Sequence, residues 1–218
     1  MGLPRIATYD VPGAHEHPTG RVDWTVDPNR SAILVHDMQQ YFVDAFAEAD
    51  GPVGLAIGHI SRLLDAARAA GVPVIYTAQP AAQAPDDRGL LSEFWGPGLQ
   101  DQESAAIVAE LRPAPGDTIL TKWRYNAFIR TPLRETLAAQ HRDQLVIVGV
   151  YAHIGCLLTA ADAFMNDIRP FLVADAVADF SREDHLFALD YAAKRCARVL
   201  DTDTVLAAFS SDAPGASR

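Results

Sequence analysis

Apolar and polar positions follow two different periods along this chain, and stretches of the two kinds alternate. Residues 32–35 are four consecutive apolar side chains, which is typical of a strand buried on both faces of a parallel sheet. Residues 55–70 instead carry apolar side chains at helical spacing, and Gly71 and Pro73 follow as a usual stop signal. This alternation predicts parallel strands that are joined by right-handed helical crossovers.

The same patterns continue to the end of the chain and predict six strands. The first strand stops at Asp37, and the others are expected at residues 72–77, 118–121, 144–150, 170–174 and 197–200. Helices are expected at residues 55–70, 103–111, 156–167, 181–196 and 204–209, with another that starts at Thr131 and Pro132. The sequence therefore predicts a doubly wound α/β fold, with a mostly parallel six-stranded sheet and helices on both faces.

The expected domain organisation is simple. Residues 1–30 contain four prolines and no helical periodicity, so we expect an extended arm that lies on the domain, with Trp24 as a possible anchor. Residues 31–209 form one domain of ordinary size, and residues 210–218 form a frayed tail. Residues 81–102 have no clear period, and a loop of this length is more often functional than idle.

Composition argues against several classes of partner and several cellular compartments. The net charge of −10 argues against a nucleic-acid or anionic-membrane partner, because both require a basic face. No apolar run is long enough to span a bilayer and no secretory signal is visible. The chain has two cysteines, Cys156 and Cys196, which are too few for a disulfide framework. These observations favour a soluble protein of the reducing cytoplasm.

Candidate chemistry gathers where the predicted strands end. Asp37 and Lys122 follow the first and third strands, and residues 151–155 follow the fourth. The carboxyl ends of parallel strands meet at one edge of a sheet, so these positions can line one cleft. The alternatives are an Asp37 that caps a turn or pairs with a surface base, and a Lys122 that is simply solvated.

Several common catalytic motifs are absent from the sequence. It contains no dinucleotide-binding glycine fingerprint, no P-loop and no nucleophile elbow. The only histidines at metal-ligand spacing, His15 and His17, lie in the proline-rich arm, where exposure to solvent is the better interpretation. His36 and His153 lie at strand ends, where packed and hydrogen-bonded histidines are the more frequent case.

Six runs make the chain similar to a known family. They are HDMQQYF (36–42), YTAQP (76–80), RGLLSEFWGPG (88–98), TKWRYNAF (121–128), GVYAHIGCLLTAADAF (149–164) and RPFLVADAVADFS (169–181). Together they resemble the isochorismatase family, and within it the hydrolases of aryl siderophore and phenazine biosynthesis. The resemblance covers nearly the whole chain, from about residue 6 to residue 206.

The wider superfamily, which includes nicotinamidases, uses an Asp–Lys–Cys triad, and Asp37 and Lys122 match its first two members. In thiol members five residues separate the strand-end glycine from the cysteine. The same count from Gly149 reaches Gly155, not Cys156. A shift of one residue at a helix start turns the side chain by about 100°, so we interpret Cys156 as a packing residue.

The resemblance further implies hydrolysis of an enolpyruvyl ether of a small anionic dicarboxylate, without a metal or another cofactor. Thiol amidases with a metal carry an Asp-x-His segment, whereas residues 77–85 read TAQPAAQAP. Asp37 is the expected acid, with Lys122 beside it. The residues that the resemblance places against substrate are Phe42, Gln79, Arg88, Trp95, Tyr125, Tyr151 and Gly155. A cis peptide after the fourth strand, which we place at Val150–Tyr151, and a homodimer are also implied.

Some alternatives remain open from the sequence. Trp95 and Phe42 are equally compatible with ordinary core positions. The substrate can be isochorismate or 2-amino-2-deoxyisochorismate, and a separate carrier protein can be a partner. A cysteine hydrolase of a small amide, similar to a nicotinamidase, is the competing enzyme. A non-catalytic α/β module that docks in a biosynthetic assembly is the alternative from another class.

Overall fold

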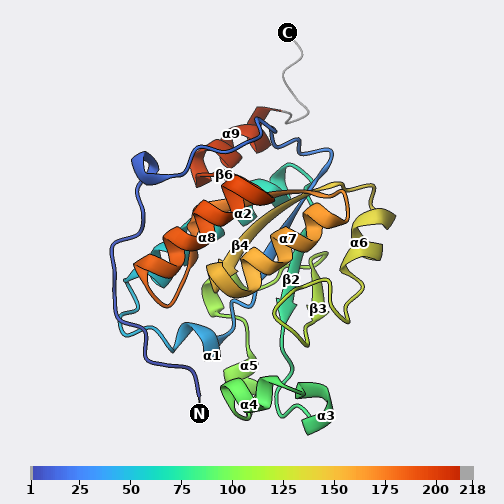
Figure 1. Cartoon of the computed structure of the whole chain (residues 1–218). Helices are drawn as coiled ribbons and strands as arrows, with labels where there is room; N and C mark the ends of the chain where they lie inside the picture. Colours follow the sequence, from blue (N-terminus) through green and yellow to red (C-terminus); the bar gives the residue numbers. More distant parts are fainter. Residues whose placement is uncertain (1, 212–218) are drawn as a thin grey trace.

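The computed structural model describes residues 2–211 of the chain. Within these residues, six strands form one parallel sheet in the order β3-β2-β1-β4-β5-β6 (Figure 1). The strands are β1 (Ser31–His36), β2 (Val74–Ala78), β3 (Thr118–Thr121), β4 (Gln144–Val150), β5 (Arg169–Ala178) and β6 (Arg198–Leu200). The predicted doubly wound α/β fold is confirmed.

Long helices connect the strands, and short ones gather in the connection between β2 and β3. The helical segments are η1 (Ala14–Glu16), α1 (Gln40–Val43), α2 (Pro52–Ala69), α3 (Pro85–Arg88), α4 (Leu91–Trp95), α5 (Gln102–Ala105), η2 (Ala109–Leu111), α6 (Leu133–Ala139), the π-helical η3 (Ala152–Cys156), α7 (Leu157–Met165), α8 (Arg182–Arg195) and α9 (Thr202–Ser211). None of the helices among residues 2–211 has the length and apolar character that a membrane crossing requires.

The sheet is the middle of three layers. Ile33 and Val35 of β1 belong to the core that includes α2 and α9, whereas Ala32 and Leu34 belong to the core that includes α6, α7 and α8. Figure 1 shows α7 and α8 lying across the front of the sheet, with α2 behind it. Because both faces of β1 and β4 are buried, these strands are recognisable in the sequence as continuous apolar runs.

The predicted helix at residues 103–111 is wrong. Only α5 and the short η2 are helical there, and Ala106 between them has extended backbone angles. The intervening residues pair with the chain after β1: the amide of Gln40 donates to Ala106, and the amide of Val108 donates to Met38. Tertiary backbone pairing therefore overrides the local helical pattern.

Four short helical segments were not predicted: η1 in the N-terminal arm, α1 after β1, and α3 and α4 within residues 81–102. Other differences lie at the ends of elements. β5 continues to Ala178, past its expected end at residue 174, and its register with β4 shifts between Ile147 and Gly149. α9 includes Ser210 and Ser211, which were expected in the tail. Residues 212–218 of that tail lie outside the described residues.

The N-terminal residues run along the domain and contact several of its elements. Ile6 exchanges backbone hydrogen bonds with Ala45 and Ala47, and the Trp24 ring lies 6.5 Å from that of Phe171 in β5. The Tyr9 hydroxyl accepts from the Asp179 amide at 2.8 Å, just beyond β5. The contacts of Ile6 and Tyr9 bring the beginning of the chain to the end of the sheet where β1 and β4 stop, whereas Trp24 lies near the start of β5.

Candidate active site

One pocket contains every residue that the sequence analysis singled out as a site residue. Its lining includes Asp37, Phe42, Gln79, Arg88, Trp95, Lys122, Tyr125, Tyr151 and Gly155, and it encloses about 520 Å³, counting its open mouth. The pocket lies at the carboxyl ends of β1 to β4, where the strand order reverses between β1 and β4. Open α/β sheets bind ligands at such a point.

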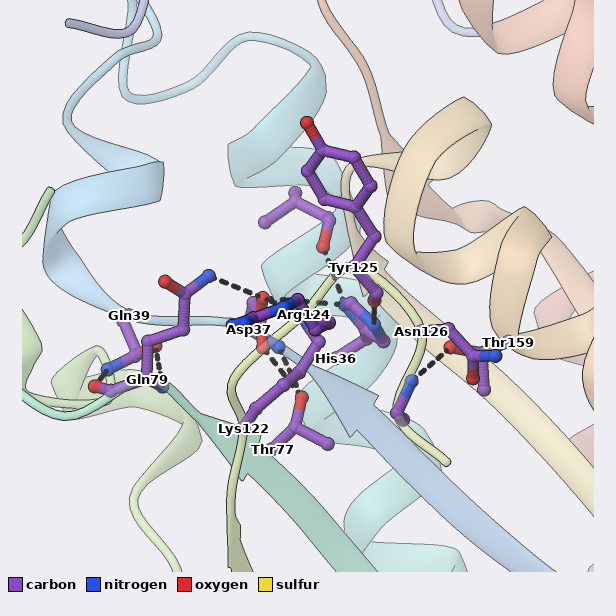
Figure 2. Close-up of polar contacts among 12 residues, drawn as sticks. His36, Asp37, Gln39, Thr77, Gln79, Lys122, Arg124, Tyr125, Asn126 and Thr159 are labelled. Carbon is purple, nitrogen blue, oxygen red and sulfur yellow. Dashed lines mark hydrogen bonds and ion pairs between the residues drawn. The ribbon is translucent and has the colours of Figure 1, made fainter. Parts of the chain in front are cut away.

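The centre of the pocket is a buried ion pair. Lys122 Nζ lies 2.6 Å from Asp37 Oδ2, and the two residues are 1% and 4% exposed. The other carboxylate oxygen, Oδ1, accepts a hydrogen bond from the Thr77 hydroxyl at 2.7 Å, and Gln79 Nε2 lies 3.5 Å from Oδ2. Figure 2 shows Thr77 of β2, Gln79 just after β2 and Lys122 just after β3 converging on Asp37, which follows β1. The alternative of a solvated Lys122 is thereby excluded.

Two opposing effects act on the Asp37 carboxyl. Burial raises its pKa, but the Lys122 charge, the nearby His36 and the hydrogen bonds from Lys122 and Thr77 lower the pKa below its ordinary value. In the empty pocket Asp37 is therefore a carboxylate at neutral pH.

Position 155 has to be glycine because the His36 ring takes the space beside it. A Cβ on Gly155 would lie 2.0 Å from Cε1 of His36 and 2.7 Å from its Nε2. The ring cannot easily move, because it is buried and donates a hydrogen bond to a backbone carbonyl; its two nitrogens lie 2.9 Å and 3.1 Å from the carbonyl oxygens of Val150 and Tyr125. Burial lowers the pKa of His36 to about 4, so the ring is neutral and donates to one of these carbonyls.

Cys156 points into the core and not into the pocket. It is fully buried among the apolar residues of the α7 and α8 side, and it does not line the pocket, whereas Gly155 does. Burial raises the pKa of its thiol well above the ordinary value, which removes the thiolate that a nucleophile needs. The expected peptide bond between Val150 and Tyr151, just before this segment, is cis as predicted.

Arg88 adds a second positive charge to the pocket. It is 5% exposed, its Nε donates to the Gly96 carbonyl at 2.6 Å, and its Nη1 has no hydrogen-bond partner among residues 2–211. Gly98, with φ of 72°, lies against the guanidinium, where a Cβ would be 2.4 Å from Nη1. The backbone at Gly96 and Gly98 therefore positions the Arg88 guanidinium. The free Nη1 can bind an anion.

Aromatic side chains close the rest of the pocket. Trp95 Nε1 donates to the Tyr125 hydroxyl at 2.6 Å, and the Tyr151 hydroxyl donates to the Phe42 carbonyl at 2.9 Å. Since the single hydroxyl proton of Tyr151 is used in this way, Tyr151 can only accept a hydrogen bond from a ligand. Phe180 packs on Tyr151 with ring centroids 4.4 Å apart.

Sequence reasoning missed several residues of this region, among them Thr77, Phe180 and Gln39. Thr77 contacts Asp37, and Phe180 lines the pocket. Gln39 is fully buried and accepts from the amide of Gln79 while donating to its carbonyl, each at 2.8 Å. Thr77 was detectable in principle, because it is the polar residue near the end of an apolar strand. Phe180 follows β5 beyond the point where the sequence placed the strand end.

A cluster of possible metal ligands lies behind the pocket. His153, Asp179 and Asp184 bring their ligand atoms within 4.8 Å of one another. Hydrogen bonds already occupy this cluster: Asp179 accepts from the His153 amide and Nδ1 and from the Phe180 amide, and Asp184 accepts from Ser181. The geometry therefore matches a structural network that joins η3 to the end of β5.

Comparison with known proteins identifies the family. Residues 31–204 match the model of the isochorismatase domain. Isochorismatase from Bacillus subtilis is 52% identical over 94% of this chain, which spans 66% of that protein. Phenazine biosynthesis protein PhzD from Pseudomonas fluorescens is 47% identical over 94% of this chain and 99% of its own length.

The fold is also similar to a solved structure that is named for a different activity. The cysteine hydrolase from Pseudomonas syringae pv. phaseolicola superposes with a TM-score of 0.80 and 25% identity, covering 89% of this chain and 98% of that one. The fold is therefore shared with cysteine hydrolases, but the pocket of this chain presents glycine and not cysteine beside Asp37 and Lys122. The chain belongs to the isochorismatase family of hydrolases.

Proposed function

We propose that this chain hydrolyses the enolpyruvyl ether of isochorismate, or of 2-amino-2-deoxyisochorismate, to pyruvate and a trans-dihydrodiol or its amino analogue. The observation that supports this most directly is the pairing of the buried Asp37 carboxyl with the buried Lys122, in a pocket that also contains the buried Arg88 and a bare Gly155. A vinyl ether is hydrolysed by protonation of its terminal carbon, which requires a placed acid and no nucleophile.

In the proposed reaction, Asp37 gives a proton to carbon and later receives one from water. The O–H bond of Asp37 breaks as a C–H bond forms at the terminal methylene of the substrate, which leaves an oxocarbenium ion beside the new carboxylate. Water adds to that ion and gives its proton to Asp37, and the hemiketal collapses to pyruvate and the ring alcohol. No atom of the protein bonds to carbon at any step.

Substrate binding has to raise the pKa of Asp37, so that its carboxylate takes up a proton from solvent before the reaction. Lys122 lowers the pKa of Asp37 in the free protein. A dicarboxylate in the pocket attracts the Lys122 ammonium and places negative charge near Asp37, and both effects raise the Asp37 pKa. Asp37 and Lys122 therefore titrate as a coupled pair whose protonation follows substrate binding.

The remaining pocket residues are proposed to bind and enclose the substrate. Arg88 is placed to hold one carboxylate through its unpaired Nη1, while Gln79 and Tyr151 are placed near the polar groups of the ring. The first helical turn around Gly155 favours negative charge in the pocket. Phe42, Trp95 and Tyr125 line the pocket and exclude bulk water.

One assay separates this proposal from the alternatives. Purified protein is given isochorismate and 2-amino-2-deoxyisochorismate in separate reactions, and pyruvate is followed with lactate dehydrogenase. Pyruvate release from either substrate is the expected result. Ammonia release from nicotinamide without pyruvate release would instead identify a cysteine hydrolase. If the folded protein converts none of these three compounds, the result would favour the non-catalytic docking module.

Replacing Cys156 by alanine is expected to keep most of the activity. The thiol is buried in the α7 and α8 core, so its loss should lower the free energy of unfolding by about 1 kcal/mol, as for a small core truncation. The measurements are pyruvate release and intact mass during turnover. A fall in activity of more than about tenfold with the fold intact, or a substrate-sized adduct on Cys156, would contradict the proposal.

The proposed partners follow from the family resemblance, on which both a homodimer and a carrier protein as a partner are proposed. The chain spans 66% of the length of the Bacillus subtilis relative. Size-exclusion chromatography with light scattering tests the first proposal, because a monomer at assay concentration would contradict it.

A further inference from the structure

We infer that Thr77 is a positioning residue that fixes the Asp37 carboxyl and directs its transferable proton to Oδ2. This inference rests on the proposed function, because it concerns the acid of that reaction. Thr77 lies at the end of β2 with no exposed surface, directly opposite His36 of β1 in the strand register. It is not part of the pocket lining, so it acts on the substrate only through Asp37.

The Thr77 hydroxyl makes two hydrogen bonds to the same residue. Its oxygen accepts from the Asp37 backbone amide at 3.1 Å, and its proton is donated to Asp37 Oδ1 at 2.7 Å. Asp37 has a φ of 51°, in the left-handed region that a residue with a side chain seldom adopts. Thr77 therefore holds both the unusual backbone of Asp37 and the plane of its carboxyl group (Figure 2).

This arrangement makes the two carboxyl oxygens unequal. A hydroxyl has one proton, and in Thr77 that proton is directed to Oδ1. A proton on Oδ1 would force Thr77 to accept twice and would leave its own proton without an acceptor among the described residues. Oδ2 has no such conflict once Lys122, 2.6 Å away, turns toward the substrate, because a protonated Oδ2 can still accept from the Gln79 side-chain amide 3.5 Å away. The proton that goes to carbon is therefore carried by Oδ2.

The hydrogen bond from Thr77 also sets how acidic Asp37 is. Donation to a carboxylate stabilises the charged form, and the Thr77 hydrogen bond is one cause of the lowered Asp37 pKa. Without this donor, Asp37 holds its proton more firmly and can carry it on either oxygen. Both changes slow transfer to carbon, while the residues that contact the substrate stay in place.

The test is the pH dependence of kcat in Thr77→Val, Thr77→Ser and the wild type. Valine keeps the shape of threonine without the hydroxyl, and we expect kcat to fall by about tenfold or more, with KM changed less than about threefold. The activity is carried by protonated Asp37, so it is lost as the pH rises through the pKa of the bound enzyme. In Thr77→Val the raised Asp37 pKa should move the alkaline limb of the kcat profile up by about one pH unit. In Thr77→Ser, both kcat and the pH of this limb should return to the wild-type values.

Two controls make the result decisive. Thr159 is equally buried and accepts a backbone hydrogen bond from Ala127 outside the pocket, so Thr159→Val should leave the alkaline limb at the wild-type pH. Far-UV circular dichroism and thermal unfolding report whether each variant is folded. If kcat falls in Thr77→Val but the limb stays in place, or if serine does not restore it, Thr77 is only structural and the inference is overturned.

A separate readout keeps this inference distinct from the proposed function. If the wild type releases no pyruvate, the proposed function fails, and the Thr77 inference is then tested by carbon-13 NMR titration of the aspartate carboxyls. The Asp37 signal, assigned with Asp37→Asn, should titrate at higher pH in Thr77→Val than in the wild type. Equal titration midpoints would overturn the inference on their own.

Discussion

Replacing Asp37 by asparagine is expected to lower the rate of pyruvate release by about 10²–10⁴-fold, the usual contribution of a placed general acid. The amide has nearly the same shape as the carboxyl but has no proton acidic enough to protonate carbon. Substrate binding should be largely retained, because Arg88 and Lys122 keep their charges. Calorimetry with the slow variant and isochorismate measures binding, and pyruvate release measures the rate.

The matched control for this change is Asp203→Asn. Asp203 forms an ion pair with Arg62 at 2.8 Å, and its side chain is 80% exposed, so the loss of this surface pair should change neither activity nor stability noticeably. Turnover of Asp37→Asn within about tenfold of the wild type would remove Asp37 from the role of acid.

Replacing Gly155 by alanine is expected to have the second-largest effect. The new Cβ would lie 2.0 Å from the His36 ring, which is buried and donates a hydrogen bond to a backbone carbonyl. Overpacking of this kind lowers the free energy of unfolding by about 1–3 kcal/mol, and displacement of the ring would also disturb the Tyr125 and Val150 backbone that lines the pocket. Urea unfolding and pyruvate release measure the two effects.

Gly58→Ala is the matched control, because nothing lies within 4 Å of a Cβ at that position in α2. Alanine in a helix interior is favoured over glycine by about 0.5–1 kcal/mol, so this variant should be at least as stable as the wild type. In a double-mutant cycle, His36→Ala combined with Gly155→Ala should be less destabilised than the sum of the single changes. A Gly155→Ala variant as stable and active as Gly58→Ala would show that the ring does not restrict position 155.

The positions of Asp37 and Lys122 were predictable because of a simple physical rule. Asp37 follows the apolar run that forms the buried strand β1, Lys122 follows the short edge strand β3, and strand ends of a parallel sheet meet at one edge. The count from Gly149 also placed Gly155, and not Cys156, in the pocket, as the structure has it. The six strands follow from the same apolar runs.

Other features depend on contacts between segments far apart in the sequence, and the local pattern does not contain them. Residues 103–111 have a helical pattern, but backbone pairing of Ala106 and Val108 with the chain after β1 competes with it. The fit of His36 against Gly155 depends on the packing of β1 against η3, and the contact of Thr77 with Asp37 depends on the register of β1 and β2. A sequence pattern alone specifies neither packing nor register at this precision.

The central claim is that Asp37 transfers a proton to carbon in the slow chemical step. The most direct test is the solvent isotope effect on a single turnover of isochorismate, compared in H₂O and D₂O at equivalent points on the pH profile, so that product release does not mask the chemistry. Proton transfer from a general acid predicts a clearly slower reaction in D₂O. An equal or faster reaction in D₂O would mean that no proton moves from Asp37 in that step, and would contradict this mechanism.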